Sequence, residues 1–150
     1  MISLYRISRK AFLPQDPSGG YHSEGRWHHQ GISVLYCCTS LPMCIFELRA
    51  NKVEFDIIRT GYHFTRCDAE ISRSLEVVSD AFYAPDWTIN KTASQKLGED
   101  WLKSKRTLFL AVKSAPLPTE TNYIINPSHP DFASIRFTSP ESIPLDLRVT

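Results

Sequence analysis

The sequence predicts one mixed α/β domain over residues 1–150, with a mixed β-sheet core and flanking helices. Its length of 150 residues suits one domain with one buried core. Hydrophobic residues make up 42% and charged residues 22%, which is ordinary for a globular protein. Strand-like stretches predominate and do not alternate regularly with helical ones. Since GxGxxG and P-loop sequences are also missing, a doubly wound nucleotide-binding fold is disfavoured.

The N-terminal part begins with a strand over residues 2–7, where side chains alternate in character. Residues 8–31 are rich in Pro, Gly, Ser and His and predict a long loop. Loops of this length inside a compact domain are uncommon and tend to be functional. Residues 32–38 form an apolar, β-rich run that predicts a central strand.

A helix is expected from Ser40 to about Ala50. Ser40 is a suitable N-cap, and Pro42 falls in the first turn, where a proline is tolerated. Phe46 and Ala50 share an apolar face at helical spacing, and Glu47 sits at its border. Such a charge commonly marks the solvated edge of a helix, although it can also present a carboxylate to a cleft.

The C-terminal two thirds add further elements. Residues 53–64 alternate and predict a long strand or hairpin, whereas residues 70–80 leave helix and strand open. Residues 83–87 are a loop, and residues 92–104 have the apolar spacing of an amphipathic helix. The strands expected after it are the stretches 107–113, 123–125, 135–137 and 145–149.

Charge and cysteine usage exclude several classes of protein. A net charge of +1 gives no basic surplus for nucleic-acid binding. No apolar run approaches the roughly 20 residues that span a bilayer, and the N-terminus lacks the layout of a signal peptide. Without CxxC or zinc spacing, the cysteines are expected to be reduced core thiols of a cytoplasmic protein: Cys37, Cys38, Cys44 and Cys67.

The first candidate site is the string from Gly25 through Arg26 and Trp27 to Gly31. Its glycines allow close approach of the backbone to a ligand, and a guanidinium binds a diphosphate through paired hydrogen bonds. A surface loop whose Arg26 packs on Trp27 is the plainer interpretation. His28 and the next histidine lack a carboxylate partner in the sequence, so no metal is expected.

Two further regions carry polar residues that a core does not need. Tyr36 on the expected central strand and Glu47 on the helix offer an aromatic face and a carboxylate, although each is commonly structural when taken alone. Ser114 ends a strand outside any GxSxG elbow, so a serine hydrolase is disfavoured. Asn126 begins an Asn-Pro turn that stiffens the chain.

Taken in order, these strings resemble the RES domain, the toxin half of bacterial RES/Xre toxin–antitoxin pairs. The resemblance runs from about residue 4 to residue 147. The matching strings are Tyr5-Arg6, Gly25-Arg26-Trp27, Val34-Leu35-Tyr36, Glu47, Gly98-Glu99-Asp100-Trp101-Leu102, Val112-Lys113-Ser114-Ala115 and Asn122-Tyr123-Ile124-Ile125-Asn126-Pro127 with His129-Pro130-Asp131. Against the usual family pattern, His28 replaces an Asn.

The resemblance implies a fold related to ADP-ribosyltransferases and an activity that consumes NAD+ as a substrate, with no further cofactor. By position it makes Arg26, Tyr36 and Glu47 the catalytic residues, with support from three more: Arg6, Ser114 and Asn126. It also implies an Xre-type helix-turn-helix antitoxin as partner and a possible homo-oligomer within the complex.

A mechanism follows as a hypothesis. Cleavage of the nicotinamide–ribose bond develops oxocarbenium character on the ribose. Arg26 would bind the diphosphate, Tyr36 would stack on nicotinamide or ribose, and Glu47 would stabilise the positive charge. The acceptor is water, phosphate or, as an alternative, a protein side chain. A non-catalytic nucleotide-binding module is the second alternative.

Overall fold

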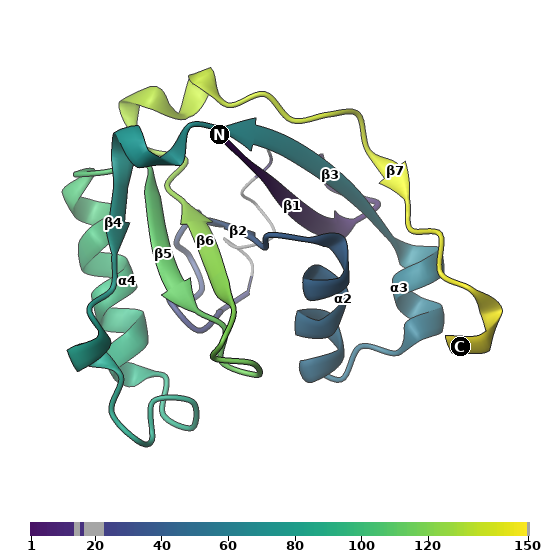
Figure 1. Cartoon of the computed structure of the whole chain (residues 1–150), viewed down its shortest axis with the longest axis horizontal. Coiled ribbons are helices and arrows are strands. Elements are labelled where there is room, and N and C mark those ends of the chain that lie inside the picture. The colour runs from purple at the N-terminus through teal and green to yellow at the C-terminus, as the bar shows by residue number, and fades with distance from the viewer. Residues whose placement is uncertain (14–15, 17–22, 150) are drawn as a thin grey trace.

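The computed structural model describes residues 1–13, 16 and 23–149, and arranges them as two sheets with helices beside them (Figure 1). The expected mixed α/β class is confirmed. The expected loop over residues 8–31 falls partly on positions 14–15 and 17–22, which lie outside the described residues.

A three-stranded antiparallel sheet has the order β1-β3-β7, with β1 at Ile2–Arg9, β3 at Tyr62–Ala69 and β7 at Glu141–Ser142. Ile2 lies opposite Ala69 and Arg9 lies opposite Tyr62. Burial alternates along β1, so that Leu4, Arg6 and Ser8 all face inward. Two polar side chains are thereby placed on the buried face of this strand.

A four-stranded sheet has the order β2-β6-β5-β4, with β2 at Leu35–Cys37, β6 at Thr121–Ile125, β5 at Phe109–Lys113 and β4 at Leu75–Val77. β4 runs parallel to β5, and the other pairs are antiparallel. Tyr5 and Cys38 exchange backbone hydrogen bonds of 2.8 and 2.9 Å, which joins β1 to the end of β2. The two sheets therefore meet at this bridge.

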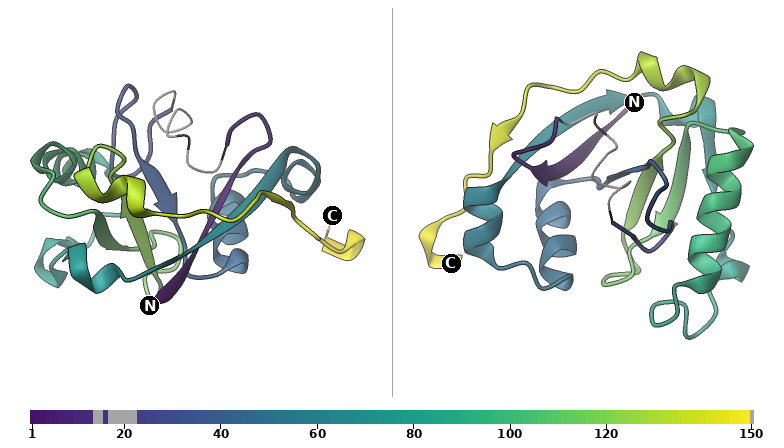
Figure 2. Two further views of the ribbon diagram at one scale, coloured as in Figure 1. Left: turned by 90° about the horizontal axis from the view of Figure 1, so that it is seen from above. Right: turned by 180° about the vertical axis from the view of Figure 1, so that it is seen from behind.

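Within the described part of the chain, three α-helices flank the sheets: α2 at Leu41–Ala50, α3 at Phe55–Gly61 and α4 at Thr92–Ser104. Helix α4 runs along the four-stranded sheet, whereas α2 and α3 lie beside the three-stranded one (Figures 1 and 2). Trp101 anchors α4 from a fully buried position, and its indole N–H donates to Thr107 Oγ1 over 2.8 Å.

The helices at 40–50 and 92–104 and the strands around 2–7, 32–38, 107–113 and 123–125 are confirmed within a few residues. The side-chain oxygen of Ser40 accepts from the amide of Met43, as an N-cap should. The ambiguous stretch 70–80 forms a 3₁₀ turn at Ile71–Ser74 and then β4. A second turn at Asp80–Phe82 leads into the loop expected over 83–87.

The prediction of a long strand or hairpin over residues 53–64 is wrong in its first half, because Phe55–Gly61 is helix α3. Contacts one helical turn apart stabilise it. Arg59 pairs with Asp56 at 3.3 Å, and the Thr60 hydroxyl donates to the Asp56 carbonyl. Ile58 supplies the buried side of this short helix. The strand begins at Tyr62 as β3.

Both closing strands were also predicted wrongly. Residues 135–137 follow a 3₁₀ turn at Pro130–Ser134 as extended chain, and Ile135 and Phe137 pack on the core without pairing in a sheet. Leu147–Val149 is another 3₁₀ turn. The strand that completes the three-stranded sheet is the two-residue β7, which pairs with β3.

The four cysteines are buried free thiols, as expected. Burial raises the pKa of the Cys67 thiol to about 11 and also raises that of Cys37. These thiols therefore stay protonated in the folded protein at neutral pH. Among the described residues, no helix has the length and apolar character that crossing a membrane requires.

Candidate active site

A cavity of about 860 Å³ lies where the two sheets meet. Residues of β1, of β2 and of helix α2 line it, together with the segment before β2. Four of the six predicted site residues are on its wall: Arg6, Arg26, Tyr36 and Glu47. A cavity of this size accommodates a cofactor-sized ligand.

Helix α2 presents Glu47 to this cavity, and two donors from the four-stranded sheet hold one of its oxygens. Ser114 Oγ donates to Glu47 Oε1 over 2.6 Å, and Asn122 Nδ2 donates to the same oxygen over 2.7 Å. Because neither donor is charged, they orient the carboxylate without supplying a counter-ion. The Oε2 atom receives neither of these bonds.

Asn122 is a further residue of the candidate site, and no sequence motif assigns it a role. It lies on β6, opposite Val112 of β5, and it lines the cavity. Asparagine is depleted in strands, so an asparagine beside the apolar run 123–125 was the available signal.

The other two predicted residues lie behind the cavity wall. Ser114 is fully buried and reaches the site through Glu47. Asn126 is buried at the end of β6, where it donates to the carbonyl of Leu102 on α4 over 2.9 Å and accepts from the Ser128 amide. These contacts tie β6 to α4 and give Asn126 no place on the cavity wall.

The guanidinium of Arg26 is held by the chain just before α4. Its two terminal nitrogens donate to the carbonyls of Trp87 and Thr88, each over 3.0 Å, and it lies 5.6 Å from the Trp87 ring centroid. Burial lowers the pKa of Arg26, and the nearby charge of Glu47 partly offsets this. Of its five N–H groups, these two bonds leave three for other acceptors.

A second guanidinium, that of Arg6, points into the cavity from β1. Its Nη1 donates to the carbonyl of Tyr36 over 3.3 Å, and burial lowers its pKa. Ser8, two residues further along the same face, also lines the cavity. Among the described residues, no hydrogen-bond partner reaches its buried Oγ.

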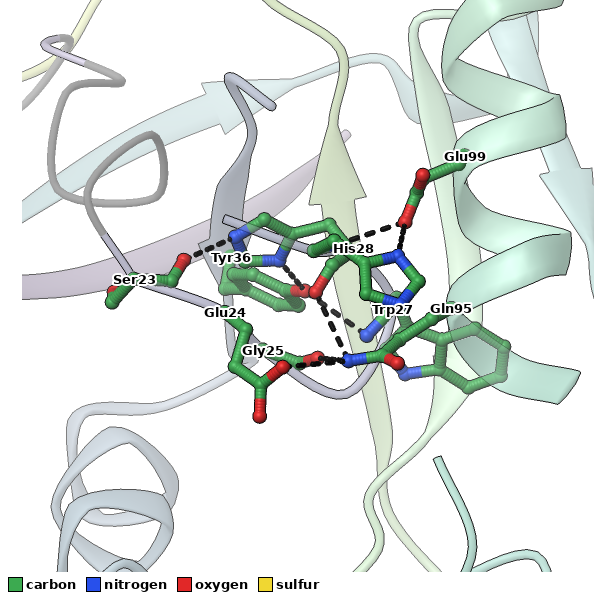
Figure 3. A network of polar contacts seen from close by, with 9 residues as sticks. Ser23, Glu24, Gly25, Trp27, His28, Tyr36, Gln95 and Glu99 are labelled. Atoms are coloured by element: carbon green, nitrogen blue, oxygen red, sulfur yellow. Dashed lines mark hydrogen bonds and ion pairs between the residues drawn. The ribbon is translucent and has the colours of Figure 1, made fainter. Parts of the chain in front are cut away.

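The hydroxyl of Tyr36 is part of a polar network (Figure 3). It accepts from the Trp27 amide over 3.2 Å and lies 2.7 Å from His28 Nδ1, while His28 Nε2 lies 2.8 Å from the Ser23 carbonyl. Burial raises the pKa of Tyr36, so its hydroxyl stays protonated. A Cβ on Gly25 would lie 2.7 Å from that hydroxyl, which explains the need for glycine there.

Helix α4 contacts residues 25–29, the part of the chain that carries Arg26 and His28. Gln95 Nε2 donates to the carbonyls of Gly25 and His28, over 3.0 and 3.3 Å. The Glu99 carboxylate bonds both the amide and the ring of His29. A Cβ on Gly98 would stand 2.0 Å from the Trp27 carbonyl oxygen, so α4 and the segment are in direct backbone contact. Residues 23–29, which we call the Arg26 segment, are thereby fixed between β2 and α4.

The described residues hold no group of three or more His, Cys, Asp or Glu side chains placed to bind a metal ion. His29 pairs with Glu99, and His28 belongs to the Tyr36 network. The cavity wall therefore offers cationic groups and carboxylates together: the guanidiniums of Arg6, Arg9 and Arg26, the ammonium of Lys91, and the carboxylates of Glu24 and Glu47.

Sequence comparison identifies relatives along most of the chain. "Toxin Res" of Pseudomonas putida is 30% identical over 134 residues, covering 89% of this chain and 90% of that protein. "Toxin Res" of Yersinia enterocolitica is 29% identical and covers 99% of both. The "Prs ADP-ribosylating toxin" of Sphingobium sp. is 29% identical over 79% of this chain and 76% of that protein.

Among solved structures, the M. tuberculosis MbcT–MbcA toxin–antitoxin complex contains a chain with the same fold. The TM-score is 0.74 at 12% sequence identity, covering 95% of this chain and 84% of that one. The model of the RES domain family matches residues 3–147. The chain therefore belongs to the RES domain family.

Proposed function

We propose that this protein is the toxin of a toxin–antitoxin pair and that it consumes NAD+ by cleaving the bond between nicotinamide and ribose. The observation that carries the proposal is that Arg26 and Glu47, 21 positions apart in the sequence, line one cavity. A guanidinium suits a diphosphate, and a carboxylate suits a sugar that gains positive charge as its glycosidic bond breaks. Relatives named as toxins support the cellular role.

In the proposed reaction, Arg26 and Arg6 bind the diphosphate, and Tyr36 contacts nicotinamide or its ribose. The C1′–N bond breaks, and its electron pair leaves with nicotinamide, which becomes neutral. Glu47 stabilises the positive charge on the ribose electrostatically. The oxygen of water or phosphate then bonds to C1′, giving ADP-ribose, with loss of the water proton, or ADP-ribose 1″-phosphate.

Purified protein incubated with NAD+, with and without phosphate, tests the proposal when the products are separated and identified. Glu47→Gln is the matched control because Gln retains an Oε1 that can accept from Ser114 and Asn122. Loss of a preorganised electrostatic group costs on the order of 100- to 1000-fold in rate. Unchanged NAD+ after incubation with wild-type protein, or an undiminished rate in Glu47→Gln, would refute the proposal.

A second candidate is transfer of ADP-ribose to a protein side chain, which the name of the Sphingobium relative favours. NAD+ labelled in the adenylate part distinguishes the two. Label that enters protein in a lysate, and is absent with Glu47→Gln, identifies transfer, whereas label found only in small products identifies hydrolysis or phosphorolysis. A non-catalytic nucleotide-binding module would bind NAD+ and leave it intact.

The partner that we propose is a helix-turn-helix antitoxin of the Xre type. The solved relative was crystallised as a toxin–antitoxin complex, which supports such an assembly. Growth of cells that express the chain alone, or together with a helix-turn-helix protein encoded beside it, tests this role if such a gene is found there. We expect arrest that the second protein relieves, and no arrest with Glu47→Gln.

A further inference from the structure

The His28 ring is held at both nitrogens, and this determines where its proton lies. Nε2 lies 2.8 Å from the Ser23 carbonyl, which can only accept, so Nε2 carries the hydrogen. In a neutral ring Nδ1 is then unprotonated and accepts. Its neighbour is the Tyr36 hydroxyl at 2.7 Å, which must therefore donate.

The Tyr36 hydroxyl is oriented as a consequence. It donates its proton to His28 and accepts from the Trp27 amide over 3.2 Å. The His28 side chain is 2% exposed, so water does not substitute for its nitrogen. The ring planes of His28 and Tyr36 are inclined by 45° with centroids 5.5 Å apart, so the rings also pack together.

We propose that His28 is a positioning residue, which fixes the hydroxyl of Tyr36 and thereby holds Arg26 and Tyr36 in one geometry across the cavity. Arg26 lies between Gly25 and Trp27, and both neighbours touch this network. A shift of the Arg26 backbone would therefore disturb the hydrogen bond from the Trp27 amide to the Tyr36 hydroxyl. The inference rests on the proposed function, in which Tyr36 and Arg26 contact the substrate.

Two substitutions test the hydrogen bonds of the two ring nitrogens of His28 separately. His28→Asn places an amide oxygen as far from Cβ as Nδ1, so it can accept from Tyr36, but it does not reach the Ser23 carbonyl. His28→Gln places its amide at the level of Nε2, so it can donate to Ser23 but offers no acceptor to Tyr36. The two variants differ little in size, which makes each the control for the other.

We expect His28→Asn to retain most of the NAD+-cleaving activity and His28→Gln to lose roughly tenfold in kcat/KM, the loss of about one hydrogen bond. In a Tyr36→Phe background, where the hydroxyl is missing, the difference between the Asn and Gln variants should vanish. Equal kcat/KM values for the two variants in the wild-type background, or a difference that persists without the hydroxyl, would overturn the inference.

NMR spectroscopy tests the proposed His28–Tyr36 hydrogen bond without a measurement of enzymatic activity. In protein labelled with ¹⁵N-histidine, the resonance missing from His28→Asn identifies the ring among the five histidines. We expect the pattern of a neutral ring protonated at Nε2, and a shift of the Nδ1 resonance in Tyr36→Phe. Protonation at Nδ1, or no response to Tyr36→Phe, contradicts the inference. If wild-type protein leaves NAD+ intact while this pattern is found, the proposed function fails and the His28–Tyr36 bond stands.

Discussion

Ser114 Oγ donates a hydrogen bond of 2.6 Å to Oε1 of Glu47, although 67 positions separate the two residues in the sequence. Asn122 donates to the same oxygen. The four-stranded sheet thus determines which way a carboxylate on helix α2 faces. The orientation of Glu47 therefore depends on strands β5 and β6 as much as on its own helix.

Ser114→Ala removes one of the two donors to Glu47. We expect kcat for NAD+ cleavage to fall about tenfold, since a hydrogen bond to a charged group contributes roughly 1.5–3 kcal/mol. KM should change less, because Ser114 lies behind the cavity wall. Steady-state kinetics measures both values. Ser134→Ala, at an exposed site, is the control, and an unaltered kcat in Ser114→Ala would contradict the orienting role.

Asn122 supplies the second donor, and its replacement by Asp reverses the electrostatics. Asn122→Asp sets a second carboxylate about where a donor now stands 2.7 Å from Glu47. Two carboxylates at such a distance disfavour each other's charge. We expect at least a tenfold greater loss of kcat at neutral pH than in Asn122→Ala. Equal rates for the two variants would show that Asn122 does not act on the charge of Glu47.

Ser8→Ala tests whether a ligand uses the hydroxyl on β1. Its Oγ is buried without a partner among the described residues, so its removal should leave the free protein as stable or slightly more stable. We expect KM for NAD+ to rise severalfold at nearly constant kcat, because the substrate would lose a hydrogen bond. Ser3→Ala, on the same strand, is the control. An unchanged KM would exclude Ser8 from binding.

Gly98→Ala tests the contact between α4 and the Arg26 segment. Alanine ordinarily stabilises a helix interior by about 1 kcal/mol relative to glycine. Here its Cβ would meet the Trp27 carbonyl oxygen at 2.0 Å. We expect a loss of roughly 3 kcal/mol in the free energy of unfolding, measured with urea. Lys103→Ala, on the exposed side of α4, should be nearly neutral. Stabilisation by Gly98→Ala would disprove the contact.

Stability should decrease at alkaline pH because buried thiols resist ionisation. The pKa of Cys67 rises from 9.0 to about 11 on folding, so its stabilising contribution is complete below pH 9 and is lost as pH rises toward 11. Two pH units correspond to about 2–3 kcal/mol. Urea unfolding at a series of pH values should show this loss, with a smaller slope in Cys67→Ala. An equal slope would contradict it.

Sequence patterns predicted the helices and strands that are marked by their own apolar spacing or capping residues. Helix α4 has 13 residues with a regular apolar spacing, and α2 has a Ser40 cap. Helix α3 has only seven residues, so its alternation could not be distinguished from a strand. The two-residue strand β7 is defined by its pairing with β3, and no local sequence pattern predicts it.

Residues of the candidate site could be proposed from the sequence, but their geometry could not. Motif strings named Arg26, Tyr36 and Glu47, which do line the cavity. Their partners come from distant parts of the chain. Arg26 bonds the carbonyls of Trp87 and Thr88, and no side-chain pattern records such a contact. Asn126 had the same polar character as Asn122, and only the register of β6 assigns them different surroundings.

The bridge between Tyr5 and Cys38 has a consequence for inhibitors. Arg6 approaches the cavity from one sheet and Tyr36 from the other, with this pair of backbone bonds close to both. A compound that binds residues of both sheets would stabilise the contact between the sheets and raise the melting temperature of the whole molecule. A compound that contacts a single wall could still bind after the two sheets part, and a ligand that binds both states does not oppose their separation.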